Sequence, residues 1–222
     1  SGLDAVFQAE EEAIILEDDC VPDPSFFRFC EELLEKYRYD SRVMMINGTN
    51  ILEEWKSDQQ SYHFAYFGSC WGWATWRRAW QYYDLEMKLW EKPEVQQRIK
   101  DVICNMEQAE RFQTIFTKVY NNQVNSWAYR FLFARLLQSG LTIIPSVNLV
   151  SNIGFTENST HTKVNFKKVG KMKADSIQFP LKHPYGITVD RTYDSSRFNK
   201  TKLTLKRRIQ SKLLRTLNQI GN

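Results

Sequence analysis

A short apolar run that ends in three acidic residues is the feature that most constrains the fold of this chain. The sequence AIILEDDCVP occupies residues 13–22, and Glu17, Asp18 and Asp19 directly follow its apolar part. Such a run predicts a buried β-strand that carries carboxylates at its C-terminal end, where open α/β sheets bind ligands. Neighbouring carboxylates repel one another unless a hard cation or a donor-rich ligand shares their charge, so the pattern indicates a site for Mg²⁺ or Mn²⁺. A solvated acidic turn after a strand is the alternative.

Several other segments accompany this run in a fixed order. The quoted blocks are AIILEDDCVPDPSFFRFCEELLEKY, RVMMINGTN, WGWATWRRAW, NSWAYRF and PSVNLVSNIGFTENSTHT. Together they resemble the nucleotide-sugar-dependent glycosyltransferases of the GT-A fold, especially a bacterial branch related to family 2 enzymes and to N-acetylglucosaminyltransferase I. The resemblance implies an α/β fold with a mixed sheet flanked by helices. It also implies transfer of a sugar, with inversion, from a nucleotide-diphosphate donor to a glycan or lipid-linked acceptor in cell-surface polysaccharide synthesis; retention stays open.

The same resemblance implies roles for the acidic residues. Asp19 would ligate a divalent metal, Mn²⁺ or Mg²⁺, that bridges the donor diphosphate. Asp18 would face the ribose or the sugar of the donor, and Glu17 would support both. His161 lies in a late block of the resemblance and would be a further metal ligand, although a lone surface histidine is the more frequent explanation.

Four tryptophans lie close together between residues 71 and 80. Trp71 and Trp73 flank Gly72, and aromatic rings pack well against sugar faces while glycine allows close approach, so we expect these residues and Trp127 to contact donor or acceptor. Trp76 and Trp80 are spaced as neighbours on a helix and are expected to be core residues.

The chain departs from the family pattern at one residue that matters for catalysis. The family pattern places an aspartate after the tryptophan of NSWAYRF, as the general base at a helix N-terminus, and this chain has Ala128 there. Alanine cannot accept a proton, and no Asp or Glu occurs anywhere from Arg111 to Thr156. Either another segment supplies the base, with Asp84 as our candidate, or the chain is catalytically impaired. A non-catalytic glycan-binding or assembly module and a metal-dependent nucleotidyl or phosphoryl transferase are the alternative functions.

The patterns predict three regions. Residues 1–165 form the GT-A-like portion, residues 166–198 an irregular extension, and residues 199–222 a basic amphipathic helical tail. The strand with the acids comes so early that we expect a nucleotide-binding part of the domain to precede Ser1.

Within the first region the patterns predict individual elements. We expect a helix capped by Asp23, with Pro24 at its first position, that leads to a strand at residues 42–47 in a βαβ unit. The other expected elements are strands at 62–67 and 141–144 and helices at 74–83, 93–106, 107–121 and 126–137.

Composition and charge indicate where in the cell the protein is expected to work. The formal net charge is +4, but the basic residues gather from Arg197 onward, where no acidic residue occurs. The four cysteines form no CxxC pair, which favours reduced thiols in the cytoplasm. The tail is expected either to bind the anionic inner face of a membrane or to pack its leucines on the domain. No nucleic-acid-binding motif accompanies its charge.

Overall fold

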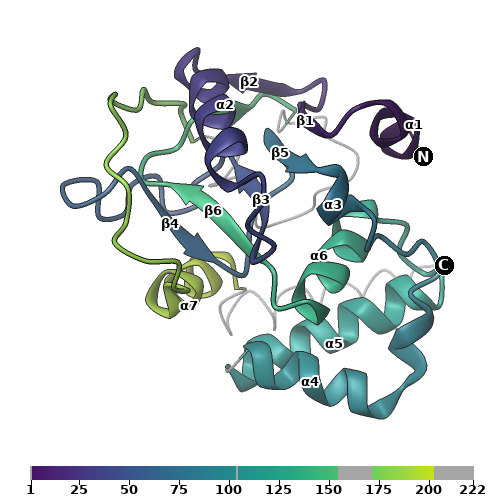
Figure 1. Cartoon of the computed structure of the whole chain (residues 1–222). Coiled ribbons are helices and arrows are strands. Elements are labelled where there is room, and N and C mark those ends of the chain that lie inside the picture. Colours follow the sequence, from purple (N-terminus) through teal and green to yellow (C-terminus); the bar gives the residue numbers. More distant parts are fainter. Residues whose placement is uncertain (1, 104, 155–171, 203–222) are drawn as a thin grey trace, which may run out of the picture.

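The computed structural model describes residues 2–103, 105–154 and 172–202, and within them the chain forms a five-stranded mixed sheet with helices around it (Figure 1). The strand order is β1-β5-β3-β6-β4, in which only β3 and β6 pair in parallel. The bounds are β1 Glu12–Ile15, β3 Val43–Asn47, β4 Tyr62–Ala65, β5 Trp73–Trp76 and β6 Leu141–Pro145. A separate two-stranded ladder joins β2 Cys20–Pro22 to β7 Val150–Asn152. The expected α/β class with a mixed, helix-flanked sheet is confirmed at this level.

The helices divide into groups around the sheet. Helix α2 contacts β1, β3 and β5, whereas α4, α5 and α6 pack together as a layer of their own (Figure 1). The bounds are α1 Gly2–Ala9, α2 Ser25–Tyr37, α3 Arg77–Trp80, η1 Lys88–Glu91, α4 Pro93–Ile103, α5 Met106–Tyr120, α6 Trp127–Leu137 and α7 Arg191–Thr201. The expected helices at 93–106, 107–121 and 126–137 are confirmed within a few residues.

Helix α2 begins one residue later than its sequence predicts. The first residue assigned to the helix is Ser25, although Pro24 before it already has a helical φ of −54° and ψ of −30°. Asp23 still serves the helix start, because its Oδ1 accepts hydrogen bonds from the backbone N–H and the hydroxyl of Ser25 at 2.9 and 2.6 Å. The buried face of α2 carries the predicted apolar stripe, which includes Phe26, Cys30 and Leu33.

The helix expected at residues 74–83 is wrong in its first part. Residues 73–76 form β5, and only Arg77–Trp80 are helical. All four residues of β5 are buried, so their sequence lacks the alternation that would reveal a strand. The predicted βαβ unit also changes: β1 and β3 run in the same direction, but β5 lies between them and is antiparallel to both.

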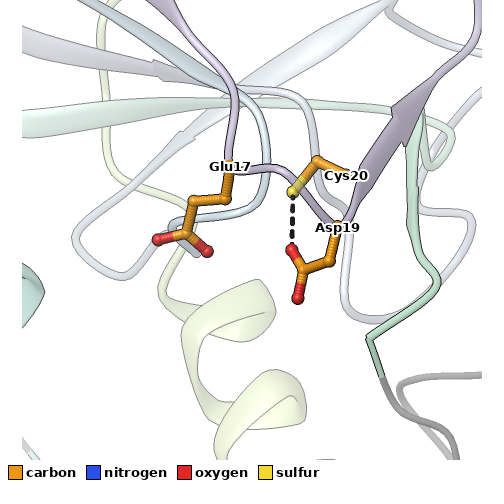
Figure 2. A group of neighbouring side chains, drawn as sticks. All are labelled: Glu17, Asp19 and Cys20. Atoms are coloured by element: carbon orange, nitrogen blue, oxygen red, sulfur yellow. Dashed lines mark hydrogen bonds between the residues drawn. The ribbon is translucent and has the colours of Figure 1, made fainter.

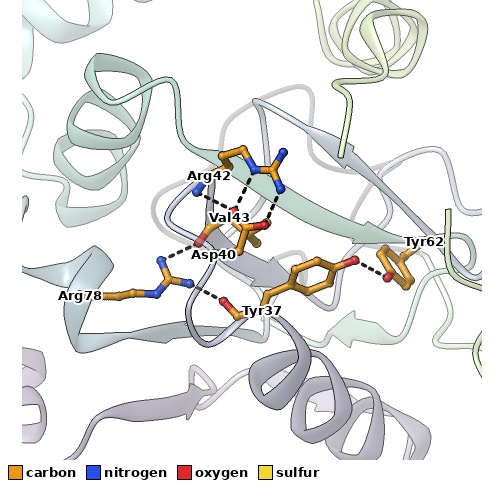
Figure 3. Close-up of polar contacts among 6 residues, drawn as sticks. All are labelled: Tyr37, Asp40, Arg42, Val43, Tyr62 and Arg78. Atoms are coloured by element: carbon orange, nitrogen blue, oxygen red, sulfur yellow. Dashed lines mark hydrogen bonds and ion pairs between the residues drawn. The ribbon is translucent and has the colours of Figure 1, made fainter. Parts of the chain in front are cut away.

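Arg78, at the start of α3, fixes the chain between α2 and β3 (Figure 3). Its guanidinium donates to the carbonyl oxygens of Tyr37 at 2.8 Å, Arg38 at 2.7 Å and Val43 at 2.9 Å. The planar fork of arginine can satisfy several carbonyls at once, and here it joins α3 to a turn far away in the sequence. On the same turn, Tyr37 shares a 2.6 Å hydrogen bond between hydroxyl groups with Tyr62 of β4.

The described part of the C-terminal region packs on the main body. Met172, Ile177 and Leu181 belong to the core between α2 and the sheet. Helix α7 contacts β4 and buries Tyr193 and Phe198. The boundary expected at 198/199 therefore falls inside a helix, and residues 191–198 are helical rather than irregular. The remainder of the predicted tail helix, residues 203–222, lies outside the described residues.

The cap of α5 gives a stability prediction. Asn105 Oδ1 accepts a 2.9 Å hydrogen bond from the backbone N–H of Gln108. Asn105→Ala should lower the free energy of unfolding by ~1 kcal/mol, measured by urea denaturation, because that N–H loses its partner. Asn105→Ser, which keeps an acceptor, should lose less. An equal loss in both variants would contradict the capping role.

Candidate functional site

Three side chains that could hold a metal ion gather in the connection between β1 and β2. The potential ligand atoms of Glu17, Asp19 and Cys20 all lie within 4.8 Å of one another. Figure 2 shows the two carboxylates and the thiol on this connection. Asp18 lies between them in sequence but is exposed and is not part of the group. The structure therefore brings together two of the three predicted acidic residues.

Asp19 is held in place by the strand that follows β6. Its Oδ1 accepts a 2.9 Å hydrogen bond from the side-chain amide of Asn152, and its carbonyl accepts from the N–H of Ile153 at 2.9 Å. A Cβ added to Gly154 would lie only 2.2 Å from Asp19 Oδ2. Glycine is therefore needed at residue 154 for the backbone to come this close to the carboxylate.

The electrostatics of this connection suit an oxygen-ligated cation. Partial burial raises the pKa of the Glu17 carboxyl, and the charges of Asp19 and Asp18 raise it further. Burial raises the pKa of the Cys20 thiol to about 11, so the thiol stays protonated at neutral pH, and its Sγ donates to Asp19 Oδ1 at 3.7 Å. Glu17 and Asp19 are therefore the available charged ligands. Carboxylate oxygens are what Mg²⁺ and Mn²⁺ take, and a divalent cation would relieve the repulsion between the acids.

A pocket of ≈ 330 Å³ opens beside this connection. Its walls come from the segment between β4 and β5, from α5 and α6, and from α7. Cys70 and Trp71 line it, and partial burial, followed by the charge of Glu17, raises the pKa of the Cys70 thiol to about 12. The acidic connection therefore lies close enough to the pocket wall for the charge of Glu17 to act on Cys70.

The predicted aromatic residues divide between the pocket and the core. Trp71 and Trp127 line the pocket, as expected of residues that contact a sugar. Trp73 has no exposed surface and stacks on Trp127, with ring centroids 5.2 Å apart. A side chain without exposed surface cannot contact a sugar directly, so we withdraw Trp73 from the predicted wall. Gly72 has a φ of +61°, and a Cβ there would approach Val150 to 2.7 Å, so its role is to let two backbone segments pack closely.

Two predicted core residues are confirmed. Trp76 and Trp80 are 2% and 5% exposed. They are not neighbours on one helix, however, because Trp76 ends β5 and Trp80 ends α3.

Ala128 lies in the first turn of α6 and lines the pocket. Within the described part of the chain, no aspartate, glutamate or histidine lines this pocket. Asp84, our candidate for the base, is not among the residues that line this pocket. Its carboxylate caps a turn instead, accepting from the N–H groups of Glu86 at 2.9 Å and Lys88 at 2.8 Å.

Several sequence-predicted features lie outside the description. His161, the proposed additional metal ligand, and the basic stretch after residue 202 are among the residues that the structure does not describe. Of the helices that it does describe, none combines the length and the apolar character needed to cross a bilayer.

Sequence reasoning missed the charged side chains of the pocket. Arg111, Arg135 and Arg197 line it, and Asp194 interacts with the last two. Arg135 did carry a signal, because it is a charged residue inside the otherwise apolar helix segment FLFARLL. Arg197 carried none, since it reads as the first of many basic residues in the tail.

The comparisons with known proteins add no family. No protein-family model matches the chain, and a search of the curated proteins finds no match.

Proposed function

We propose that this chain is the metal- and acceptor-binding portion of a glycosyltransferase that moves a sugar from a nucleotide-diphosphate donor to a glycan or lipid-linked acceptor. One observation carries the proposal: the Glu17 and Asp19 carboxylates at the end of β1 lie next to a pocket with tryptophans in its walls. Sugar transfer from such a donor needs a cation at the diphosphate and an apolar, aromatic surface for a sugar, side by side.

The residues present fit a divalent cation, and Mn²⁺ or Mg²⁺ bound by Glu17 and Asp19 would stabilise the negative charge on the departing diphosphate. Asn152 orients the Asp19 carboxylate through its 2.9 Å hydrogen bond. Trp127 would contact the sugar, whereas Trp71 is only 7% exposed and lines the pocket as a core residue, and Gly72 lets the backbone of the Trp71 segment pack against Val150.

Release of nucleoside diphosphate tests the reaction class. The protein should release free nucleoside diphosphate from at least one member of a panel of nucleotide-diphosphate sugars with Mn²⁺, and a glycan acceptor should accelerate the release. Release of pyrophosphate, with the nucleoside monophosphate joined to another molecule, would instead show a nucleotidyl transferase.

A specific observation favours one alternative. No carboxylate or histidine among the described residues lines the pocket, so these residues supply no general base where an acceptor hydroxyl would lie. A glycan-binding module that keeps the fold without the chemistry would show this arrangement. Glycan binding without any donor turnover would establish that function.

Metal binding gives a further prediction. Mn²⁺ should bind weakly to the protein alone and much more tightly with UDP or GDP, because such ions rely on phosphate oxygens for part of their coordination. Asp19→Asn should weaken binding in the presence of the nucleotide by at least ~10-fold, measured by isothermal titration calorimetry.

Glu31→Gln on the exposed side of α2 is the matched control, because it removes the same charge away from the cluster. It should leave Mn²⁺ affinity unchanged. Equal Mn²⁺ affinity with and without nucleotide, or an unaffected Asp19→Asn variant, would refute the assignment of the metal site.

A further inference from the structure

Arginine side chains from three helices line the pocket, and two of them, Arg135 and Arg197, share the buried carboxylate of Asp194. Arg135 is on α6 and is only 3% exposed, and Arg197 is on α7. Both line the ≈ 330 Å³ space together with the first turn of α6. A buried guanidinium is costly unless its charge and its N–H groups find partners, so this pair needs an explanation.

Hydrogen bonds to the protein satisfy these groups in part. Arg135 Nη1 donates to the carbonyl of Tyr66 at 3.3 Å and to the hydroxyl of Thr142 at 2.5 Å. Arg197 Nη2 donates to the carbonyl of Gly68 at 2.8 Å. The Nε–H groups of both arginines are buried, and no described residue accepts from either one.

The charges are also out of balance. Asp194 is the described carboxylate that attracts both Arg135 and Arg197. Its oxygens already accept from the backbone N–H groups of Tyr66 at 3.1 Å and Phe67 at 3.3 Å, and burial raises its pKa to about 6. Burial and the charge of Arg197 lower the pKa of Arg135 to about 10, so the guanidinium remains charged at neutral pH. Arg135 and Arg197 therefore share, together with Arg191, one carboxylate whose own charge is destabilised by burial.

The other walls suit the body of a sugar. Trp127, Phe131 and Phe198 supply aromatic and apolar surface. The first turn of α6, which contains Ala128, also lines the pocket and carries the positive end of the helix dipole. A pocket of this size is at the small end of ligand sites, which fits one sugar ring and not an extended chain.

We propose that this pocket binds a small acidic sugar, with its carboxylate or phosphate group on the guanidinium groups of Arg135 and Arg197. That this sugar belongs to the acceptor glycan rests on the proposed function. The charged group would accept from the unpaired Nε–H groups and balance the excess positive charge, while the ring lies against Trp127. Arg135 and Arg197 would thus select acidic over neutral sugars.

Titration of the full ¹⁵N-labelled chain by NMR tests this inference without metal or nucleotide. The probes are glucuronate, glucose 6-phosphate and glucose, and the signals are the Ala128 amide and the Trp127 indole N–H. Glucuronate, glucose 6-phosphate or both should shift these signals, and glucose at the same concentrations should not. A response to glucuronate alone identifies a carboxylate as the ligand group, and a response to glucose 6-phosphate alone identifies a phosphate.

Variants on α7 separate recognition from general electrostatics. Arg197→Gln should weaken binding of the acidic sugar about tenfold or more, because a charge-assisted hydrogen bond is lost. Lys200→Gln is the matched control on the same helix, where Lys200 pairs with Glu53 at the surface, and it should bind as the wild type does. Arg197→Lys keeps the charge without the planar fork and should bind with intermediate affinity. Such a graded result would show that the loss in Arg197→Gln does not come from misfolding.

Three outcomes would overturn the proposal: no shift with either acidic sugar, equal shifts with glucose, or equal losses in Arg197→Gln and Lys200→Gln. None of them bears on metal binding or donor turnover, which the Mn²⁺ titration and the release of nucleoside diphosphate measure separately. Conversely, a protein without transferase activity that still binds glucuronate through Arg197 would refute the proposed function and keep this site.

Discussion

Ala128→Asp should raise the rate of sugar transfer by ~10²–10⁴-fold, the usual contribution of a positioned general base. The side chain at residue 128 lines the pocket in the first turn of α6, and no other described carboxylate or histidine lines it. The new carboxylate would also lie at the positive end of the helix, which favours its ionised form. The measurement is kcat for release of nucleoside diphosphate in the presence of a glycan acceptor.

Ala128→Asn is the control for this gain, because it has nearly the same shape as aspartate and cannot act as a base. It should leave kcat at the wild-type level. If the wild-type protein already turns over rapidly, and aspartate does not accelerate it, the base comes from a residue outside the described pocket walls.

Trp73→Ala should lower the free energy of unfolding by ~3–5 kcal/mol. Trp73 has no exposed surface, and its ring packs on Trp127, Trp80 and Phe131 with centroid distances of 5.2, 6.4 and 5.7 Å. The substitution leaves a cavity where β5, α3 and α6 meet, and that cavity cannot collapse without moving the sheet. Urea denaturation, monitored by circular dichroism, measures the loss.

Tyr82→Ala removes an aromatic ring that is 45% exposed and serves as the control. It should change the free energy of unfolding by less than ~1 kcal/mol. A Trp73 variant as stable as the Tyr82 variant would contradict the central place of this ring in the aromatic cluster.

Much of the fold could be predicted from local patterns. The apolar stripe of α2, the cap Ser126 and the apolar segment of β6 each indicate their element within a few residues, whereas the cap Asn105 falls inside the helix expected at 93–106. The prediction of secondary structure fails at β5, where both faces of the strand are buried. In β5, Trp73 joins the aromatic cluster around α6 while Trp76 belongs to the core under α2, and the one polar residue, Thr75, is buried as well.

The pairing of strands was harder to predict than their existence. The segment of β5 reads as the start of a helix, because arginines and aromatics continue without a turn residue from Trp76 into α3. Its position between β1 and β3 depends on contacts across the sheet, such as Thr75 donating to the carbonyl of Met44, and no local signal encodes them.

In the candidate site, too, residues that are close in sequence could be predicted, whereas residues that only the fold brings together could not. Glu17 and Asp19 are adjacent in sequence to the strand that positions them, so their proximity could be predicted. Arg135 and Arg197 meet only because α6 and α7 approach the segment between β4 and β5 from different parts of the chain. The carboxylate of Asp84 accepts hydrogen bonds from the N–H groups of its own turn, which its residue type alone does not predict.

The position of β5 in the sheet has a consequence for the order of folding. Among the described residues, strand β1 pairs only with β5, where Glu12 lies opposite Trp76 and Ile15 opposite Trp73. Helix α2 and strands β3 and β4 lie between these two strands in the sequence, so their pairing closes a long loop. The neighbouring helices α4 and α5 instead make contacts between residues close in sequence, which form with a smaller loss of loop entropy. We therefore expect the helical layer to form early and the edge that carries the two carboxylates to form late.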